Sequence, residues 1–340
     1  MNRAIASVLL LLLLTAAAPP AEPPPPQWPP APQTARLRFA GEIAGPRVAG
    51  TSRLGGFFRA LIGLDKAGEI TTDRLVKPTG LFVSSGTVFV ADPGMKAVLR
   101  YDEATGRGEW WPRGVEKRLL SPVSVAGAPD GRLFVLDSQL GKVFILDDKG
   151  TLKGELEGDP EGLGRPAALA VSDKRIYVSD VKRHRVAVYG IDGTFLQAFG
   201  RRGNRPGEFN FPTYLSFDKK TDRLWVTDSG NFRLQWFGPD GRIGGSIGEN
   251  GNRPGYLARP RGLAVDSDGH VFVSDAAFEA VQVFDDKKNF LLFVGRAGTA
   301  PGQFSMPGGV FIDGRDRVYV ADTQNARVQV FQYIKEVSHE

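Results

Sequence analysis

The sequence predicts an all-β protein, a six-bladed β-propeller built from four-stranded antiparallel blades. One pattern occurs six times: a proline, an apolar run, a tight turn, a second apolar run ending in Asp, a loop and a third apolar run. The aspartates that end the second run recur every 43 to 48 residues and are Asp92, Asp137, Asp180, Asp228, Asp275 and Asp322. A fixed period of this length is typical of a solenoid or propeller. No copy contains a helix-length pattern, so six small sheets stacked radially are expected to share their cores.

The clearest copy runs from Pro260 to Phe284, PRGLAVDSDGHVFVSDAAFEAVQVF. Asp268-Gly269 lies between two alternating apolar runs there, which strongly indicates a β-hairpin. The other five copies begin at Pro78, Pro122, Pro166, Pro212 and Pro307. The 42 glycines and 24 prolines also fit a turn-rich all-β chain.

The bulk composition permits one large domain, because 41% of the 340 residues are hydrophobic. The net charge of +5 is spread along the chain and does not by itself indicate nucleic-acid binding. The chain has no cysteine, which excludes disulfides, thiolate metal sites and a cysteine nucleophile.

Residues 1–18 have the features of a secretory signal peptide: Arg3, an apolar run from Ala4 to Leu14, and small residues up to Ala18. The sequence therefore predicts export to the periplasm or the extracellular space. The apolar run is short for a membrane span, but an uncleaved anchor remains an open alternative.

Residues 19–35 are expected to form a proline-rich linker, with nine prolines between positions 19 and 33. Such a segment favours an extended polyproline spacer, and we expect it not to pair into a sheet. Its expected role is a tether; the alternative is a ligand for a proline-binding domain.

The propeller is expected over residues 36–334, followed by a tail at 335–340. Leu37 to Gly41 forms a lone apolar run, whereas the sixth copy ends near Tyr333 without a fourth strand of its own. We therefore expect the N-terminal run to complete the last blade, which would close the ring and remove an exposed sheet edge.

Residues 51–64 carry a helical pattern with apolar residues on one face. This short helix is expected to pack over one mouth of the propeller. An interfacial membrane helix is the alternative.

The later copies share the signature Gly-x-x-Gly-x-x-Pro-Gly-x-Phe, then a hydrophobic-x-Val-x-Asp strand, then Asn-x-Arg-hydrophobic-Gln-x-Phe. Copies four and six match best, through Asn231 to Phe237 and Asn325 to Phe331. This signature resembles the NHL repeat, and the order of segments resembles secreted bacterial NHL-repeat proteins. The resemblance implies a six-bladed propeller, but the NHL scaffold serves peptide, protein, RNA and enzymatic roles.

An arginine five residues after the repeated aspartate suggests a pair that holds the turn between the second and third strands. These structural turn pairs are Asp180 with Arg185, Asp228 with Arg233, and Asp322 with Arg327.

The sequence offers no convincing catalytic or metal site, and we expect no cofactor. Gly244 to Gly248 matches a nucleophile pattern, but no helix follows it. The three histidines, His184, His270 and His339, are too few for the histidine-rich metal centre of the amidating lyases that share the NHL repeat. A metal-dependent propeller hydrolase or lyase remains the alternative function, as does a structural component of the cell envelope.

The loops expected around the first proline of copies three to five combine basic and aromatic side chains. The candidate binding residues are Arg165, Lys182, Arg183, His184, Phe211, Tyr214, Phe232, Arg259 and Arg261. Such a surface suits an acidic peptide or an anionic glycan, and export argues against nucleic acid. We therefore expect an exported, monomeric, non-enzymatic scaffold that binds protein or peptide and contacts a membrane only through its N-terminal segment.

Overall fold

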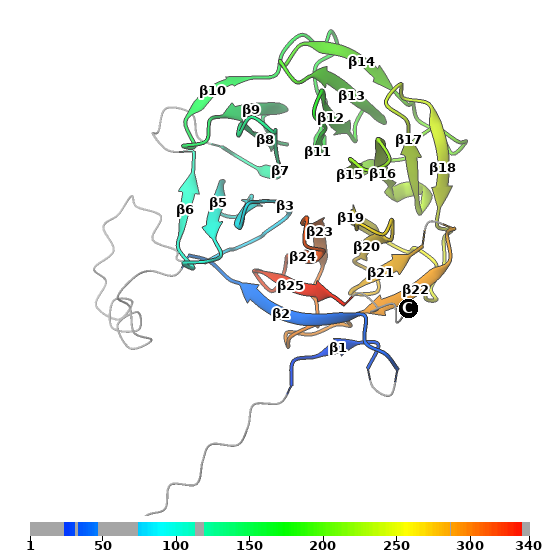
Figure 1. Ribbon diagram of the computed structural model, residues 1–340. Helices are drawn as coiled ribbons and strands as arrows, with labels where there is room; N and C mark the ends of the chain where they lie inside the picture. The colour runs from blue at the N-terminus through cyan, green and yellow to red at the C-terminus, as the bar shows by residue number, and fades with distance from the viewer. Residues whose placement is uncertain (1–23, 31–32, 47–73, 113–118, 286, 335–340) are drawn as a thin grey trace, which may run out of the picture.

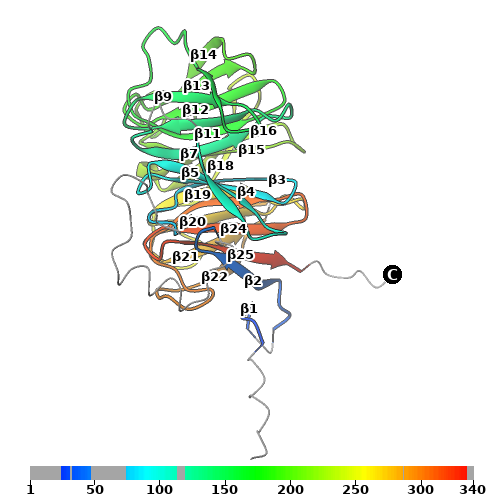
Figure 2. The same ribbon diagram turned by 90° about the vertical axis from the view of Figure 1, so that its left-hand side faces the viewer.

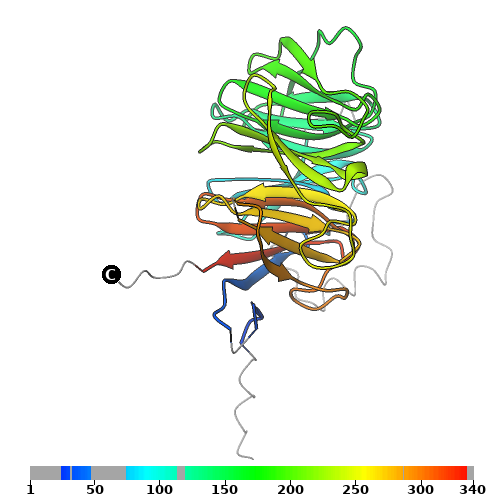
Figure 3. The ribbon, with the colours of Figure 1, turned by 90° about the vertical axis from the view of Figure 1, so that its right-hand side faces the viewer.

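The computed structural model describes residues 24–30, 33–46, 74–112, 119–285 and 287–334. Six sheets form a closed ring of blades around a central axis (Figure 1). Seen edge-on, the blades form a disc, and the end of the last strand points out from one face (Figure 2, Figure 3). The six-bladed all-β fold is therefore confirmed. The expected signal peptide, the helix at 51–64 and the tail lie outside the described residues.

The innermost strands define blades one to six and are β3 (Gly80–Ser84), β7 (Pro122–Gly127), β11 (Pro166–Val171), β15 (Pro212–Asp218), β19 (Pro260–Val265) and β23 (Pro307–Ile312). The second strands are β4 (Thr87–Asp92), β8 (Leu133–Asp137), β12 (Arg175–Asp180), β16 (Arg223–Asp228), β20 (Val271–Asp275) and β24 (Arg317–Asp322). The third strands are β5 (Ala97–Asp102), β9 (Lys142–Leu146), β13 (Arg185–Gly190), β17 (Arg233–Phe237), β21 (Ala280–Phe284) and β25 (Arg327–Tyr333). The outermost strands are β6 (Gly108–Trp111), β10 (Leu152–Glu155), β14 (Phe195–Phe199), β18 (Ile243–Ile247), β22 (Phe290–Val294) and, for blade six, β2 (Leu37–Ile43).

Turn chemistry fixes the hairpins, as the β19–β20 hairpin illustrates. Gly269 has a φ of 88°, a left-handed conformation that glycine adopts without steric cost. The Asp266 carboxylate accepts hydrogen bonds from the backbone N–H groups of Asp268 and His270 at 2.9 and 2.8 Å. The hairpin expected at Asp268-Gly269 is therefore present, and it sets the register of blade five.

The core lies between neighbouring blades rather than within any one of them. Between blades five and six, Phe272, Phe304 and Phe331 are each no more than 2% exposed. Because every sheet shares its two faces with its neighbours, no blade has a complete core of its own. Among the described residues, none of the helical structure is long and apolar enough to cross a membrane.

The N-terminal strand closes the ring, as expected. β2 pairs antiparallel with β25, with Phe39 opposite Phe331 and Ile43 opposite Val328. The Arg327 guanidinium strengthens this seam, because its Nη1 donates to Glu42 Oε2 at 2.8 Å.

The expectation that the proline-rich linker stays out of the sheet is wrong at two residues. Gln27–Trp28 forms the short strand β1, which pairs with Arg38 and Leu37 of β2. The Trp28 ring lies edge-on to Phe331, with 5.6 Å between centroids. Packing of the half-buried Trp28 against the buried Phe331 therefore outweighs the polyproline preference of the surrounding residues.

Blade six is also joined to blade one on its other side. Arg317 of β24 donates from Nη1 and Nη2 to the two carboxylate oxygens of Glu103 at 3.0 and 2.7 Å. The Tyr319 hydroxyl donates to the same carboxylate at 3.0 Å. This bidentate ion pair links residues that are 214 positions apart in sequence.

Two of the three expected turn pairs have the expected geometry. Arg233 Nε lies 2.9 Å from Asp228 Oδ2, and Arg327 Nε lies 2.8 Å from Asp322 Oδ2. Both aspartates are fully buried. Each carboxylate thus holds the loop between the second and third strands of its blade.

The expected pair of Asp180 with Arg185 is wrong. Arg185 Nη2 instead donates to Asp159 Oδ2 at 2.6 Å, in the loop before β11. That loop offers a carboxylate where the loop of blade four presents backbone carbonyls to Arg233. The guanidinium therefore turns towards the stronger acceptor.

Replacing Leu37 should destabilise the closed ring. Leu37 is 2% exposed in the cluster between blades five and six. We expect Leu37→Ala to lower the free energy of unfolding by about 2–5 kcal/mol in urea denaturation. The adjacent Arg38 is exposed, so Arg38→Ala should change it by less than about 0.5 kcal/mol. Equal effects of the two substitutions would contradict this account of the closure.

Replacing Asp228, one of the buried turn carboxylates, should destabilise the fold. Asp228 accepts hydrogen bonds from the Asn210 backbone at 2.6 Å, from Arg233 at 2.9 Å and from Gln235 at 3.2 Å. We expect Asp228→Ala to cost about 3–5 kcal/mol in chemical denaturation, because buried donors lose their acceptor. Asp240→Ala, at an exposed turn of the same blade, is the control and should be nearly neutral.

His270, which lies beside the closing strands, should make the stability of the protein depend on pH. The hydrogen bond that His270 donates to the Asp266 carboxylate raises the pKa of His270, as do the charges of Asp266 and Asp268, whereas burial and Arg36 lower it. Tyr333 of β25 packs against that ring at 5.8 Å. A group whose pKa is raised in the folded state contributes stability that is fully present below its unfolded-state pKa. That contribution is lost as the pH rises through the folded-state pKa. In thermal melts, His270→Asn should therefore lower the melting temperature more at about pH 5.5 than at about pH 9. An equal lowering at both pH values would contradict this expectation.

Candidate functional site

The candidate site lies at the centre of the face on which the first strands begin, here called the proline face. Its loops are held by the buried aspartates. Asp180 accepts from the backbone N–H groups of Gly164 and Arg165 at 2.8 and 3.0 Å, and Asp275 from those of Ala258 and Arg259 at 2.8 and 2.9 Å. The residues next to each proline are thereby fixed around the channel mouth.

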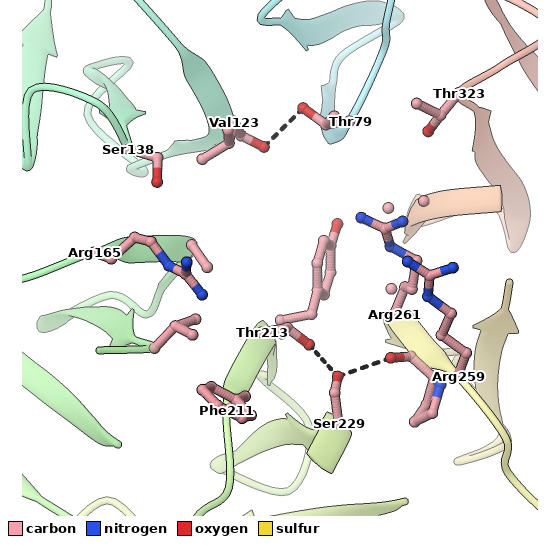
Figure 4. A pocket seen from close by; sticks show the side chains of 17 residues that line it. Thr79, Val123, Ser138, Arg165, Phe211, Thr213, Ser229, Arg259, Arg261 and Thr323 are labelled. Atoms are coloured by element: carbon pink, nitrogen blue, oxygen red, sulfur yellow. Dashed lines mark hydrogen bonds between the residues drawn. The ribbon is translucent and has the colours of Figure 1, made fainter. Parts of the chain in front are cut away.

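A cavity of about 370 Å³ occupies this mouth (Figure 4). The residue that follows the proline in each of the six blades lines it: Thr79, Val123, Ala167, Thr213, Arg261 and Gly308. The repeat makes these positions equivalent, and only blade five places a long charged side chain there. We call this space the arginine pocket.

Three guanidinium groups face the arginine pocket. Arg165 precedes the proline of β11, whereas Arg259 and Arg261 flank the proline of β19. Arg165 lies across the pocket from the other two (Figure 4). Residues two apart on an extended chain point to the same side, which places Arg259 and Arg261 together.

The pocket is strongly cationic. Among the residues that the structure describes, no Asp or Glu lines it. No ion pair or side-chain hydrogen bond is formed by Arg165, Arg259 or Arg261 within the described part of the chain. Burial and the neighbouring charge of Arg259 lower the pKa of Arg261. An anion in the pocket would therefore relieve repulsion between two cations.

Tyr214 forms the floor of the arginine pocket. The equivalent positions of the other blades hold only small residues, namely Gly80, Ser124, Ala168, Gly262 and Gly309. The Tyr214 hydroxyl reaches across to blade six and donates to the Val310 carbonyl at 3.4 Å. Burial raises the pKa of this phenol, so it stays protonated at neutral pH.

A second cavity of about 400 Å³ lies beyond Tyr214, towards the opposite mouth of the channel. Its walls combine polar groups with the half-buried side chains of Phe82, Phe217, Phe311 and Ile312. Tyr214 lines both cavities and divides the channel between them.

Hydroxyl groups between the arginines tie neighbouring blades together. Thr79 Oγ1 donates to the Val123 carbonyl at 3.0 Å, and Ser229 Oγ to the Pro260 carbonyl at 2.8 Å (Figure 4). Thr323 Oγ1 donates to the Pro78 carbonyl at 2.8 Å. These bonds make the pocket wall rigid and leave the guanidinium groups as its main free donors.

Five of the nine residues expected to bind a partner line this pocket, namely Arg165, Phe211, Tyr214, Arg259 and Arg261. Each of them lies within two residues of a first-strand proline. Sequence reasoning missed the lining residues Thr79, Ser138 and Thr323. The signal for Thr79 was available, because it follows a repeat proline.

The structure places Lys182, Arg183, His184 and Phe232 outside the pocket lining. Arg183 Nε donates to Glu161 Oε2 at 3.2 Å. His184 and Phe232 have φ values of 53° and 55°, the left-handed position just before the third strand. These residues lie in the later part of the loops between second and third strands. The first residues of such loops, Ser138, Val181, Ser229 and Thr323, do line the pocket.

His184 supports the pocket from behind. It is 8% exposed, and its Nδ1 accepts a hydrogen bond from the Phe211 backbone N–H at 3.3 Å. The two rings lie 5.0 Å apart. Phe211 itself is 44% exposed at the pocket rim. Within the described ranges, no three His, Cys, Asp or Glu side chains gather closely enough to hold a metal ion.

Family models agree with this architecture. The NHL repeat matches residues 257–284 and 304–331, which are blades five and six. A family described as a 6-bladed beta-propeller matches residues 156–241. The chain is a six-bladed β-propeller that contains NHL repeats. No curated protein sequence matches it.

Solved propellers with different roles are similar to this NHL-repeat propeller. Virginiamycin B lyase from Staphylococcus aureus has 14% identity and a TM-score of 0.56, covering 76% of this chain and 96% of its own. A gluconolactonase from Xanthomonas campestris has 17% identity and a TM-score of 0.60, covering 87% and 98%. An auxiliary nutrient binding protein from Bacteroides ovatus has 11% identity and a TM-score of 0.58, covering 77% and 70%. At these identities the likeness extends to the fold alone.

Proposed function

We propose that this NHL-repeat propeller is a non-enzymatic binding protein that holds an acidic protein or peptide at the arginine pocket. The observation that carries the proposal is the set of three guanidinium groups facing a cavity whose lining, within the described part of the chain, contains no Asp or Glu. Guanidinium groups bind carboxylates through paired, charge-assisted hydrogen bonds. The repulsion between Arg259 and Arg261 makes an anionic partner the natural counterpart.

The remaining features of the pocket support binding rather than acid–base chemistry. The phenol of Tyr214 has a raised pKa and is a poor base at neutral pH. Phe211 offers an exposed ring next to the charges, and interfaces favour such combinations of arginine and aromatic groups. Residues 1–18 support a location outside the cytoplasm, where the propeller would meet its partner.

Charge reversal at the pocket tests this function. A fluorescein-labelled hexaglutamate peptide is titrated with purified protein and followed by fluorescence polarisation. We expect Arg165→Glu combined with Arg261→Glu to weaken binding by about a hundredfold or more, because two attractive contacts become repulsive. The matched control is Arg253→Glu, an exposed arginine of the loop before β19 that does not line the pocket.

The control should bind within about twofold of the wild type, and raising the salt concentration should weaken all binding. Thermal melting of each variant shows whether the fold is retained. Equal binding by the wild type and a folded double variant would contradict the proposed site.

A further inference from the structure

We propose that the arginine pocket receives the free carboxy-terminal end of the partner chain, and not an internal segment. The inference rests on the proposed function and names the part of the acidic partner that enters. Three features carry it: a closed floor, a pair of adjacent guanidinium groups, and an aromatic ring at the rim.

The closed floor excludes threading. Tyr214 reaches from blade four to blade six between the two cavities, with its hydroxyl donating to the Val310 carbonyl at 3.4 Å. A Cβ on Gly309 would lie 2.7 Å from the Tyr214 hydroxyl, so the phenol packs directly against blade six. A chain that enters from the proline face cannot continue to the second cavity while Tyr214 keeps this position. An internal segment would have to turn back within about 370 Å³, whereas a chain end simply stops there.

The three arginine charges of the pocket match a terminal carboxylate together with a second, neighbouring carboxylate on the same peptide. Arg259 and Arg261 lie together on one wall, where two guanidinium groups can hold one carboxylate through several N–H donors. Arg165 lies on the opposite wall (Figure 4). It is placed to bind a second carboxylate, such as the side chain of a terminal Glu.

The rim supplies a contact for the residue that precedes the chain end. Phe211 is 44% exposed and has a left-handed φ of 58°. The ring of His184 and its Nδ1 hold this conformation from behind. An exposed ring fixed in this way offers an apolar surface at low entropic cost. The geometry therefore favours an apolar or aromatic side chain just before the acidic terminus.

Three peptides labelled with fluorescein at the amino end test the inference by polarisation. The first is Gly-Ser-Gly-Ser-Phe-Glu with a free carboxylate. The second is its carboxy-terminal amide. The third is an amide with one additional Glu near the amino end, which restores the net charge of the first. We expect the free acid to bind at least about tenfold more tightly than either amide, corresponding to about 1.4 kcal/mol.

The Tyr214 floor is tested with the same peptides. Tyr214→Phe keeps the ring and should keep the preference for the free acid. Tyr214→Ala opens the channel and should reduce the preference, because an amidated chain can then pass deeper. The comparison of free acid with amide in the wild type does not depend on whether Tyr214→Ala folds.

The possible results separate the two proposals. Equal binding of the free acid and the charge-matched amide overturns the terminal-carboxylate inference and leaves acidic-peptide binding standing. Displacement of the peptide by an equal concentration of glutarate also overturns it, in favour of a small-molecule dicarboxylate site. If none of the peptides and no hexaglutamate binds, both proposals fail.

Discussion

The pairing of β2 with β25 is the interaction on which the other features of this molecule depend. It joins residues 37–43 to residues 328–333, the two ends of the described propeller. Each blade relies on its neighbours for half of its core, so a ring with an open seam would expose apolar faces on both sides of that seam. Arg327 makes several of the contacts that close the ring. It binds Asp322 within blade six, Glu42 across the seam, and the carbonyls of Ala300 and Gln303 in the preceding loop.

Closure determines the geometry of the arginine pocket. The ring sets the separation of the six loops at the channel mouth, and the buried aspartates fix each loop to its own blade. Blades three and five then present Arg165, Arg259 and Arg261 from opposite walls. Hydroxyl-to-carbonyl bonds between adjacent blades hold the walls in place. A binding site made of side chains from separate blades is thus rigid because the ring beneath it is closed.

The repeat explains how much of the fold could be predicted from the sequence. Blade number, strand order and the closing strand all follow from the spacing of equivalent aspartates and prolines. The pairing of Gln27–Trp28 with β2 did not follow, because proline-rich composition favours an extended spacer. Only the three-dimensional structure shows that Trp28 has Phe331 as a packing partner.

The site could be predicted only in part, because some of its contacts join residues of separate blades or loops. The first-strand prolines mark positions that meet at the axis, so the sequence identified Arg165, Arg259 and Arg261. The mouth position of Tyr214 was also identified, but its function as a floor depends on small residues in five other blades. Arg183 was expected at the same surface, yet its partner Glu161 lies 22 residues earlier, and no sequence pattern indicates this contact.

Native-state hydrogen exchange measured by mass spectrometry tests the closed ring most directly. If β2 holds the ring closed, the amides of β2 and β25 exchange through the same opening as the buried strands of blade three, with one shared free energy of opening and one shared dependence on denaturant. Exchange of β2 at much lower free energy, while β25 and the other blades remain protected, would contradict the claim that this strand holds the propeller shut.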